Sequence, residues 1–274
     1  MQPSRQLLLT SALPCWVIGH RGAAALCPEN TLPSFRMARA AGACMIEFDV
    51  QQSADGELVV FHDETLDRLC GESSAVGALS WDELVTKVVG HWHGASLTMP
   101  RLTDVFSTLR RSLLYNIELK TNVVRYPGIE ERLVRLVHDH GVAERVLISS
   151  FQPESLRVVQ KLDHNLPLGL LIGLEQGARL GSAHALVEGA RALECFSLHP
   201  DFRLLRLYPE LVDHCHSVGL RVFPWTVDHP DVWKTLVHKL GVDGVITNDP
   251  GKLYEWLLEK DKRDFQRNAP TKKD

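Results

Sequence analysis

WVIGHRG at residues 16–22 and MIEFDV at residues 45–50 are the stretches of sequence that decide the fold. Each is a short apolar run with charged residues inside it or directly after it. The same pattern returns in LVVFHD at residues 58–63 and in LYNIELK at residues 114–120. An unpaired charge in a protein interior costs several kcal/mol, roughly, even after relaxation. Charged residues at the ends of strand-like runs therefore indicate a functional site.

Strand-like and helix-like segments alternate along most of the chain. The predicted strands are Trp16–Gly19, Met45–Gln51, Leu58–His62, Leu114–Lys120, Val146–Ser150, Leu168–Ile172, Cys195–Leu198, Arg221–Val227 and Gly244–Thr247. The predicted helices are Leu32–Ala41, Thr103–Arg110, Ile129–His140, Pro153–Leu162, Ala183–Arg191, Pro209–Val218, Pro230–Leu240 and Pro250–Glu259. Strands that alternate with helices of about 10–15 residues are typical of parallel strands joined by right-handed crossovers.

One segment interrupts this alternation. From about Glu64 to Pro100 the sequence is polar and shows one short helical signal, at Ser80–Val88. We interpret it as an insertion between a strand and its expected helix. At the carboxyl ends of the strands it would lie beside an active site and could shape substrate access, and a covering loop without function is the equal alternative. We expect one domain over residues 1–256 and a polar, loosely held tail over residues 257–274.

The composition limits the possible function classes. A chain of 274 residues that is 45% hydrophobic can bury a large core, and a barrel of alternating strands and helices typically uses ~250 residues. The net charge of -4 and the pI near 6.3 give no indication of a nucleic-acid partner. An anionic substrate would therefore need a local cationic pocket. The six cysteines include no C-x-x-C pair, which is typical of buried thiols in a reducing compartment.

The N-terminal run Leu7–Leu13 is short, and its removal as a signal peptide would leave hardly any chain before His20. No stretch approaches the ~20 apolar residues that a membrane span requires. We therefore expect a cytoplasmic protein without stable membrane association. The oligomeric state stays open.

The acidic residues of two strands predict a metal site. Strand side chains alternate between two faces, so Glu47 and Asp49 share one face, roughly 6–7 Å apart between their Cα atoms. Glu118 and Lys120 share a face in the same way. Three carboxylates without a thiolate suit a hard cation, Mg²⁺ or Ca²⁺, better than zinc. The alternative is a set of structural ion pairs, such as Glu118 with Lys120 or Glu47 with Arg21.

Two histidines are the acid–base candidates. His20 and His62 each follow an apolar run, and histidine can be poised in either protonation state near neutrality. One could accept a proton while the other donates one. Arg21 offers a planar fork suited to phosphate oxygens, and Lys120 adds a point charge. With a divalent ion, these groups would counter the charge of a phosphodiester and its transition state.

The ordered motifs of this chain resemble those of the glycerophosphodiester phosphodiesterase family. The motifs of the first half are HRG at 20–22, PENT at 28–31, EFDV at 47–50, DGELVVFHD at 55–63 and NIELK at 116–120. SSF at 149–151, PWT at 224–226 and GVDGVITNDP at 241–250 are similar to the closing motifs of the family. The resemblance spans residues 16–256, and as an ordered set the motifs are highly specific.

The resemblance implies an α/β fold, a TIM (β/α)8 barrel with a small insertion after the second strand region. The roles that it implies are metal ligation by Glu47, Asp49 and Glu118, general acid and base catalysis by His20 and His62, phosphate contact by Arg21 and Lys120, and lining of the substrate pocket by Trp225. Glu29 looks like a supporting residue whose role is open. Asn248 stands where the family often has aspartate, and we interpret that position as structural.

The activity expected from this resemblance is metal-dependent hydrolysis of small-molecule glycerophosphodiesters to sn-glycerol 3-phosphate and an alcohol. Within the same class, a lysophospholipase D-type activity on lysophospholipids is the runner-up. Two rivals come from other classes: a Schiff-base aldolase that uses Lys120, and a catalytically dead barrel that serves as a binding module. The head group, the choice between Mg²⁺ and Ca²⁺, the assignment of acid and base, and the first nucleophile (water or the glycerol 2-hydroxyl) stay open.

Overall fold

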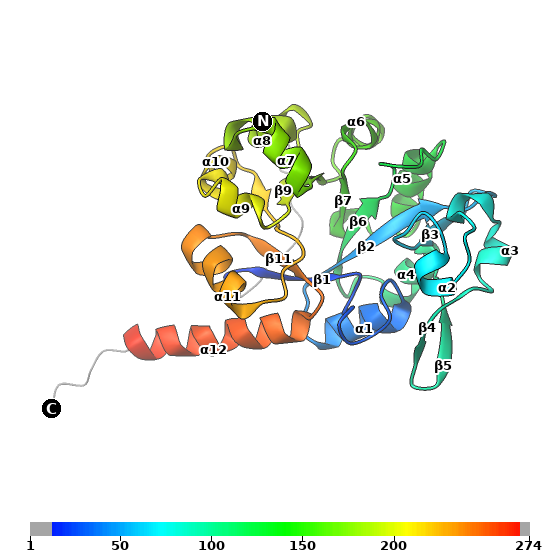
Figure 1. The fold of residues 1–274 in the computed structure, drawn as a ribbon, viewed down its shortest axis with the longest axis horizontal. Coiled ribbons are helices and arrows are strands. Elements are labelled where there is room, and N and C mark those ends of the chain that lie inside the picture. The colour runs from blue at the N-terminus through cyan, green and yellow to red at the C-terminus, as the bar shows by residue number, and fades with distance from the viewer. Residues whose placement is uncertain (1–12, 269–274) are drawn as a thin grey trace.

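The structure, a computed structural model, describes residues 13–268, and for residues 260–268 it describes only the course of the chain. In this part of the chain a barrel of parallel strands runs in the order β10-β9-β8-β7-β6-β2-β1-β11 (Figure 1). The strands are β1 (Trp16–His20), β2 (Met45–Gln52), β6 (Leu114–Leu119), β7 (Val146–Ser150), β8 (Leu168–Ile172), β9 (Ser197–Pro200), β10 (Arg221–Val222) and β11 (Gly244–Thr247). The predicted TIM barrel is confirmed.

The barrel closes between its last two strands. The Asp243 amide donates to the Val222 carbonyl at 3.2 Å, and the Val227 amide donates to the Ile246 carbonyl at 3.0 Å. The predicted strand Arg221–Val227 is regular only over its first two residues. Pro224 has no N–H and cannot donate to the ladder, although the segment continues to hydrogen-bond on both sides.

Helices cover the outside of the barrel. They are α1 (Leu32–Ala40), α4 (Leu102–Leu109), α5 (Ile129–Asp139), α6 (Pro153–Leu162), α7 (Leu174–Leu180), α8 (Ala183–Ala192), α9 (Leu204–Leu207), α10 (Leu211–Ser217), α11 (Pro230–Trp233) and α12 (Pro250–Asn268). A 3₁₀ turn, η2 (Ala143–Arg145), precedes β7, and α11 continues as a π-helix, η3 (Lys234–Leu240). Thr31 caps α1 by accepting a hydrogen bond from the Ser34 amide at 3.3 Å. Helices α7 and α9 were not predicted from the sequence.

The alternation of strand faces sorts side chains as expected. Ile46, Phe48 and Val50 of β2 point outward and join the large core between the barrel and its helices. Ile18 and Met45 point inward, where they form a smaller apolar cluster with Leu114, Leu147, Phe223 and Ile246. This cluster fills the barrel beneath the carboxyl ends of the strands. The predicted site residues on the inward face lie above this cluster, at the carboxyl ends of the strands.

The segment between β2 and α4 departs from the barrel. It contains β3 (Leu58–Val60), α2 (Asp67–Cys70), η1 (Val76–Ala78), α3 (Trp81–Leu84), β4 (Val88–Trp92) and β5 (Ala95–Thr98). These elements lie to one side of the barrel in Figure 1, where the β4–β5 hairpin extends away from it. The segment has a small apolar core of its own, which includes Phe61, Leu66 and Leu84.

The prediction of a parallel strand over Leu58–His62 is wrong. Strand β3 ends at Val60 and pairs antiparallel with β2, with Val60 opposite Val50. The connection 53–57 is far shorter than the dozen or so residues that a parallel crossover needs. It forms a hairpin turn instead, in which Gly56 adopts a φ of 92°. His62 consequently lies in a loop and not at the end of a barrel strand.

The last helix is longer than the predicted Pro250–Glu259. Helix α12 continues to Asn268 and so enters the segment expected as a polar tail. Residues 260–268, KDKRDFQRN, contain neither glycine nor proline, and lysine, arginine and glutamine are good helix formers. Residues 1–12, with most of the N-terminal apolar run, and residues 269–274 lie outside the described part. Within residues 13–268, no helix is long and apolar enough to cross a membrane.

Candidate active site

A pocket of about 230 Å³ opens at the carboxyl ends of the barrel strands. The residues that line it are His20, Arg21, Glu47, His62, Glu118, Lys120, Phe151, Leu171, Trp225, Thr226 and Ile246. Seven of the eight site residues predicted from the sequence are among them. The eighth, Asp49, is almost fully buried (1% exposed) and forms ion pairs with Arg21 and Lys120. The fold therefore brings all eight together.

The three predicted metal ligands form one cluster. Asp49 and Glu118 lie opposite each other on β2 and β6, and each of Glu47, Asp49 and Glu118 offers a carboxylate oxygen within 4.8 Å of the others. Burial raises the pKa of Glu47 well above its usual value, and the charges of Asp49 and Glu118 raise it further. Burial also raises the pKa of Glu118. A metal ion would relieve the repulsion between these buried carboxylates, so the cluster can serve as a cation site.

Two cationic side chains offset part of this negative charge. Lys120 Nζ lies 3.0 Å from Glu118 Oε1 and 3.6 Å from Asp49 Oδ1. Arg21 Nε lies 3.3 Å from Asp49 Oδ2. Burial opposes ionisation of Asp49, but the charges of Lys120 and Arg21 outweigh it and lower the pKa of this carboxyl. Glu47 receives only the backbone N–H of Arg21, at 3.1 Å, so the structural Glu47–Arg21 side-chain pair considered above does not form.

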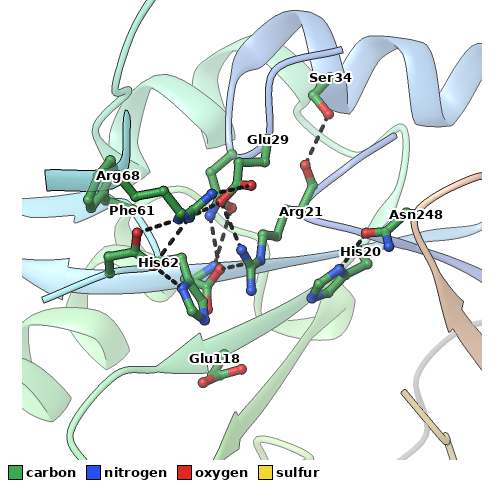
Figure 2. A network of polar contacts seen from close by, with 12 residues as sticks. His20, Arg21, Glu29, Ser34, Phe61, His62, Arg68, Glu118 and Asn248 are labelled. Atoms are coloured by element: carbon green, nitrogen blue, oxygen red, sulfur yellow. Dashed lines mark hydrogen bonds and ion pairs between the residues drawn. The ribbon is translucent and has the colours of Figure 1, made fainter. Parts of the chain in front are cut away.

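His20 and His62 lie on either side of Arg21 in the view of Figure 2. His20, at the end of β1, has its Nε2 3.9 Å from Glu47 Oε2. Its Nδ1 lies 2.7 Å from Asn248 Oδ1. Burial and then the charge of Arg21 lower the pKa of His20 to about 4, against the effect of the Asn248 hydrogen bond. His20 is therefore neutral near pH 7.

His62 has a different environment. Its Nδ1 lies 2.5 Å from Asp63 Oδ1, so the neighbouring residue in the sequence supplies a carboxylate. Arg68, on α2, donates to both oxygens of Asp63, at 2.6 and 3.2 Å. Burial opposes ionisation of Asp63, but its bonds to Arg68 and His62 lower its pKa. The Asp63 carboxylate, itself held by Arg68, therefore fixes the orientation of the His62 ring.

Glu29 connects the two sides of the site. It accepts a hydrogen bond from Arg21 Nη1 at 2.8 Å and two hydrogen bonds from Arg68, at 2.6 and 3.0 Å. A continuous series of ion pairs therefore runs from Asp49 through Arg21, Glu29 and Arg68 to Asp63 (Figure 2). The open role of Glu29 is thereby resolved in part: it orients both guanidinium groups.

The opposite wall of the pocket is apolar. Trp225 is held by a hydrogen bond of 2.8 Å from its Nε1 to the His199 carbonyl. The ring of Phe151 meets it edge-on, with 5.6 Å between centroids, and Leu171 completes the wall. Trp225 thus lies where a substrate-lining residue was expected, and Phe151 lies beside it at the mouth of the barrel.

Sequence reasoning missed three residues of the site. Asp63 had a signal, since it directly follows His62. Arg68 had none, because only the folding of α2 brings it to Glu29. Asn248 was interpreted as structural, and the contact of its side chain with His20, across 228 residues of sequence, was not foreseen.

A model of the glycerophosphoryl diester phosphodiesterase family matches residues 20–252. This chain belongs to that family. A glycerophosphodiester phosphodiesterase of Caldanaerobacter subterraneus subsp. tengcongensis is 40% identical over 243 residues, which cover 86% of this chain and 95% of the relative. One from Bacillus subtilis is 32% identical, over 85% of this chain and 83% of the relative. The resemblance found in the sequence is confirmed, and the protein is an enzyme of the phosphodiesterase class.

Solved structures agree with this membership. A glycerophosphoryl diester phosphodiesterase structure from Silicibacter pomeroyi superposes with a TM-score of 0.82 at 26% identity, covering 92% of this chain and 95% of the other. An Oleispira antarctica phosphodiesterase, solved with the product sn-glycerol-3-phosphate, superposes with a TM-score of 0.75 at 26% identity, covering 89% and 97%. The family's barrel is therefore the fold of this chain.

Proposed function

We propose that this phosphodiesterase hydrolyses glycerophosphodiesters to sn-glycerol 3-phosphate and an alcohol, with a divalent cation and two histidines. The observation that carries the proposal is a pocket that joins His20 and His62 to two cationic side chains and to Glu47 and Glu118, which belong to the buried cluster of three carboxylates. An apolar wall faces these charged groups. This arrangement suits a small molecule with a phosphate at one point and a carbon skeleton beside it.

Glu47, Asp49 and Glu118 would hold the cation, and their all-oxygen donor set favours Mg²⁺ or Ca²⁺. When bound, the ion supplies positive charge against the phosphate oxygens and the transition state. Arg21 and Lys120 line the same pocket. We assign them to the remaining phosphate oxygens, with Arg21 as the planar fork.

The surroundings of the two histidines support different roles. His20 is neutral near pH 7 because burial and Arg21 lower its pKa to about 4, so it suits the general base that accepts the proton of the nucleophile. His62 lines the same pocket and its ring is held by the Asp63 carboxylate, so we assign to it the general acid that protonates the leaving alkoxide. Asp63 and Arg68 orient His62 for that transfer.

Lys120 is unsuited to the rival role of a Schiff-base amine. That chemistry needs a lysine whose pKa is lowered. Burial acts in that direction, but Glu118 and Asp49 outweigh it and raise the pKa of Lys120 above its usual value. A borohydride-trapped substrate adduct, with full activity in chelator, would revive the aldolase.

The cysteines bear on the cellular location. All six lie in the described part of the chain, and none forms a disulfide. Free thiols are typical of a reducing compartment, so we place the enzyme in the cytoplasm.

The test is a coupled assay for glycerol 3-phosphate over a panel of diesters with choline, ethanolamine and glycerol head groups, with Mg²⁺, with Ca²⁺ and with EDTA. We expect product from soluble diesters only when a cation is present. Lysophosphatidylcholine belongs in the same panel, and preferential turnover of it would favour the lysophospholipase D alternative. Absence of product from every diester with either ion would contradict the proposal and favour a binding module.

A further inference from the structure

Asn248 and Asp228 form a hydrogen-bonded support behind His20. Asn248 Oδ1 lies 2.7 Å from His20 Nδ1, and Asn248 Nδ2 donates to Asp228 Oδ2 at 2.7 Å. Asp228 Oδ1 accepts hydrogen bonds from the backbone N–H of Asn248 at 2.8 Å and from the Thr247 hydroxyl at 2.9 Å. Figure 2 shows Asn248 on the side of His20 that faces away from His62.

These contacts determine the orientation of the side-chain amide of Asn248. The carboxylate of Asp228 can only accept hydrogen bonds, so the NH₂ group of Asn248 must face it. The carbonyl oxygen of Asn248 therefore faces His20. That oxygen can only accept, so the Nδ1 of His20 must carry a proton. In neutral His20, the proton is then on Nδ1 and the lone pair is on Nε2.

The lone pair of Nε2 faces the pocket in which the reaction is proposed to occur. Nε2 lies 3.9 Å from Glu47 Oε2, and His20 lines the pocket together with Glu47 and Glu118. A general base needs an unprotonated nitrogen that points at the nucleophile. The opposite tautomer would present an N–H there and could not accept a proton.

We propose that Asn248 and Asp228 are positioning residues that hold His20 in the Nδ1–H tautomer, with Nε2 free to accept the proton of the nucleophile. This inference rests on the proposed function for its catalytic meaning. Neither residue touches the substrate pocket itself. Both act through His20, as a carboxylate that orients a catalytic imidazole does in other hydrolases.

The first test reads the tautomer directly. In Mg²⁺-loaded protein labelled with ¹⁵N-histidine, two-bond ¹H–¹⁵N correlation spectra distinguish the two tautomers, and His20→Gln identifies the His20 signals. We expect the Nδ1–H form in the wild type and a mixture in Asn248→Leu. An Nε2–H form in the wild type would overturn the proposal.

The second test is kinetic. Loss of a residue that orients a functional imidazole typically lowers activity about 10- to 100-fold. We expect this loss in kcat for Asn248→Leu, with KM changed less than kcat, because the substrate contacts remain. An unchanged kcat in this variant would count against the proposal.

A reciprocal exchange separates positioning from general stability. Asn248→Asp places a carboxylate against Asp228, so we expect repulsion, a displaced side chain and a low kcat. The double variant Asp228→Asn/Asn248→Asp restores a donor–acceptor pair in the reverse order, again with an acceptor at Nδ1. We expect it to recover the Nδ1–H tautomer and most of the lost kcat. A double variant no better than Asn248→Asp would contradict the proposal.

Asp243→Asn is the matched control. Its carboxylate contacts His216 Nε2 at 2.8 Å and accepts a hydrogen bond from the Val222 backbone N–H at 2.8 Å. Asp243 directly precedes β11, whereas Asn248 directly follows this strand. We expect wild-type kcat from it. The spectra and the assay together also separate the proposed function from the proposed positioning. A wild-type protein with the Nδ1–H tautomer but no diesterase activity would refute the proposed function alone. An active wild-type protein with the Nε2–H tautomer would refute the positioning role of Asn248 and Asp228 alone.

Discussion

Arg68 and Glu29, 39 residues apart in the sequence, are joined by two hydrogen bonds of 2.6 and 3.0 Å. The guanidinium of Arg68 also binds Asp63, the partner of His62, while Glu29 binds Arg21. One side chain of the inserted segment therefore contacts both the partner of His62 and the partner of Arg21. If these two residues act as proposed, the insertion contributes to catalysis as well as covering the barrel.

Replacement of Arg68 by alanine should lower kcat without unfolding the enzyme. Both Asp63 and Glu29 would lose their shared partner, and loss of such an orienting partner costs about 10- to 100-fold in activity. Arg68 is 45% exposed, and exposed ion pairs contribute about 0–1 kcal/mol to stability. We therefore expect a clear loss in steady-state turnover and a small change in melting temperature.

Arg111→Ala is the control for this variant. Arg111 is similarly exposed and pairs with Glu144 at 2.7 Å, but it precedes β6 at the end of the barrel opposite the pocket. Its kcat should match the wild type. Equal kcat values for Arg68→Ala and Arg111→Ala would show that the insertion does not act on the site.

His20→Ala and His62→Ala should each reduce turnover by about 10²–10⁴, as loss of a general acid or base does. The fold should survive, because both side chains lie at the rim of the barrel and not in its core. Circular dichroism would verify folding and the glycerol 3-phosphate assay would measure the rate. His91→Ala changes an exposed histidine of the insertion whose partner is Ser96, and it should be fully active. Near-normal turnover in either catalytic variant would remove that residue from the mechanism.

Replacement of Glu47 by glutamine should abolish the thermal response to Mg²⁺. In the wild type, an ion at 100 times its Kd stabilises the fold by about 2.7 kcal/mol, or about 5–10 °C in melting temperature for a chain of this size. The variant lacks one carboxylate of the cluster and should show little shift. Glu72→Gln, which alters an ion pair with Lys87 in the insertion, should respond like the wild type.

The same variant makes a prediction for the metal-free protein. Burial and the neighbouring carboxylates raise the pKa of Glu47, so its stabilising contribution is present below the unfolded pKa of about 4.3 and is lost as the pH rises through the folded value. Neutral glutamine avoids that loss. At pH 7.5 in EDTA, Glu47→Gln should melt at or above the wild-type temperature, and a much lower value would show that Glu47 is held by a cation-independent contact.

His199 should make the folded state sensitive to mild acid. It is fully buried inside the barrel, bonds Ser197 at 2.8 Å, and burial lowers its pKa to about 3. The unfolded chain takes up a proton near pH 6.5, whereas the folded chain does not. The contribution of His199 to the free energy of unfolding is therefore present above pH 6.5. It is lost as the pH falls toward 3, by up to about 1.4 kcal/mol per pH unit.

Urea unfolding at a series of pH values would measure this effect. The free energy of unfolding should fall more steeply below pH 6.5 in the wild type than in His199→Gln. Parallel slopes would mean that His199 takes up its proton in the folded state.

Gly169 leaves the space that His199 occupies. A Cβ at this position would lie 2.7 Å from His199 Nε2 and 3.2 Å from Ser197 Oγ. Overpacking of this kind costs about 1–3 kcal/mol, so Gly169→Ala should lower the free energy of unfolding by that amount. Gly189→Ala is the matched control, because the nearest neighbour of its Cβ would be Leu170 Cδ2 at 3.7 Å. Gly189 lies inside α8, so this change should be neutral or should stabilise by up to about 1 kcal/mol.

Much of the site could be predicted because strand geometry is local. Side chains of a strand alternate between two faces, so the carboxylates of Glu47 and Asp49 could be placed together from the spacing of two residues alone. The apolar residues between them, Ile46 and Phe48, then had to face the helices, as they do. The same reasoning placed Glu118 with Lys120. The resemblance to the family motifs predicted the roles of His20 and His62 and the closure of the strands into a barrel.

The sequence by itself thus determined the barrel, the faces of its strands and the residues with the chemistry, since each depends on contacts between near neighbours in the chain. Only the tertiary structure decided which partners those residues meet. His62 reaches the pocket through an antiparallel hairpin. Asn248 meets His20 because β11 pairs with β1, and Arg68 meets Glu29 because the inserted segment folds against the chain that follows β1. Such contacts depend on how distant segments pack, and no spacing in the sequence encodes that packing.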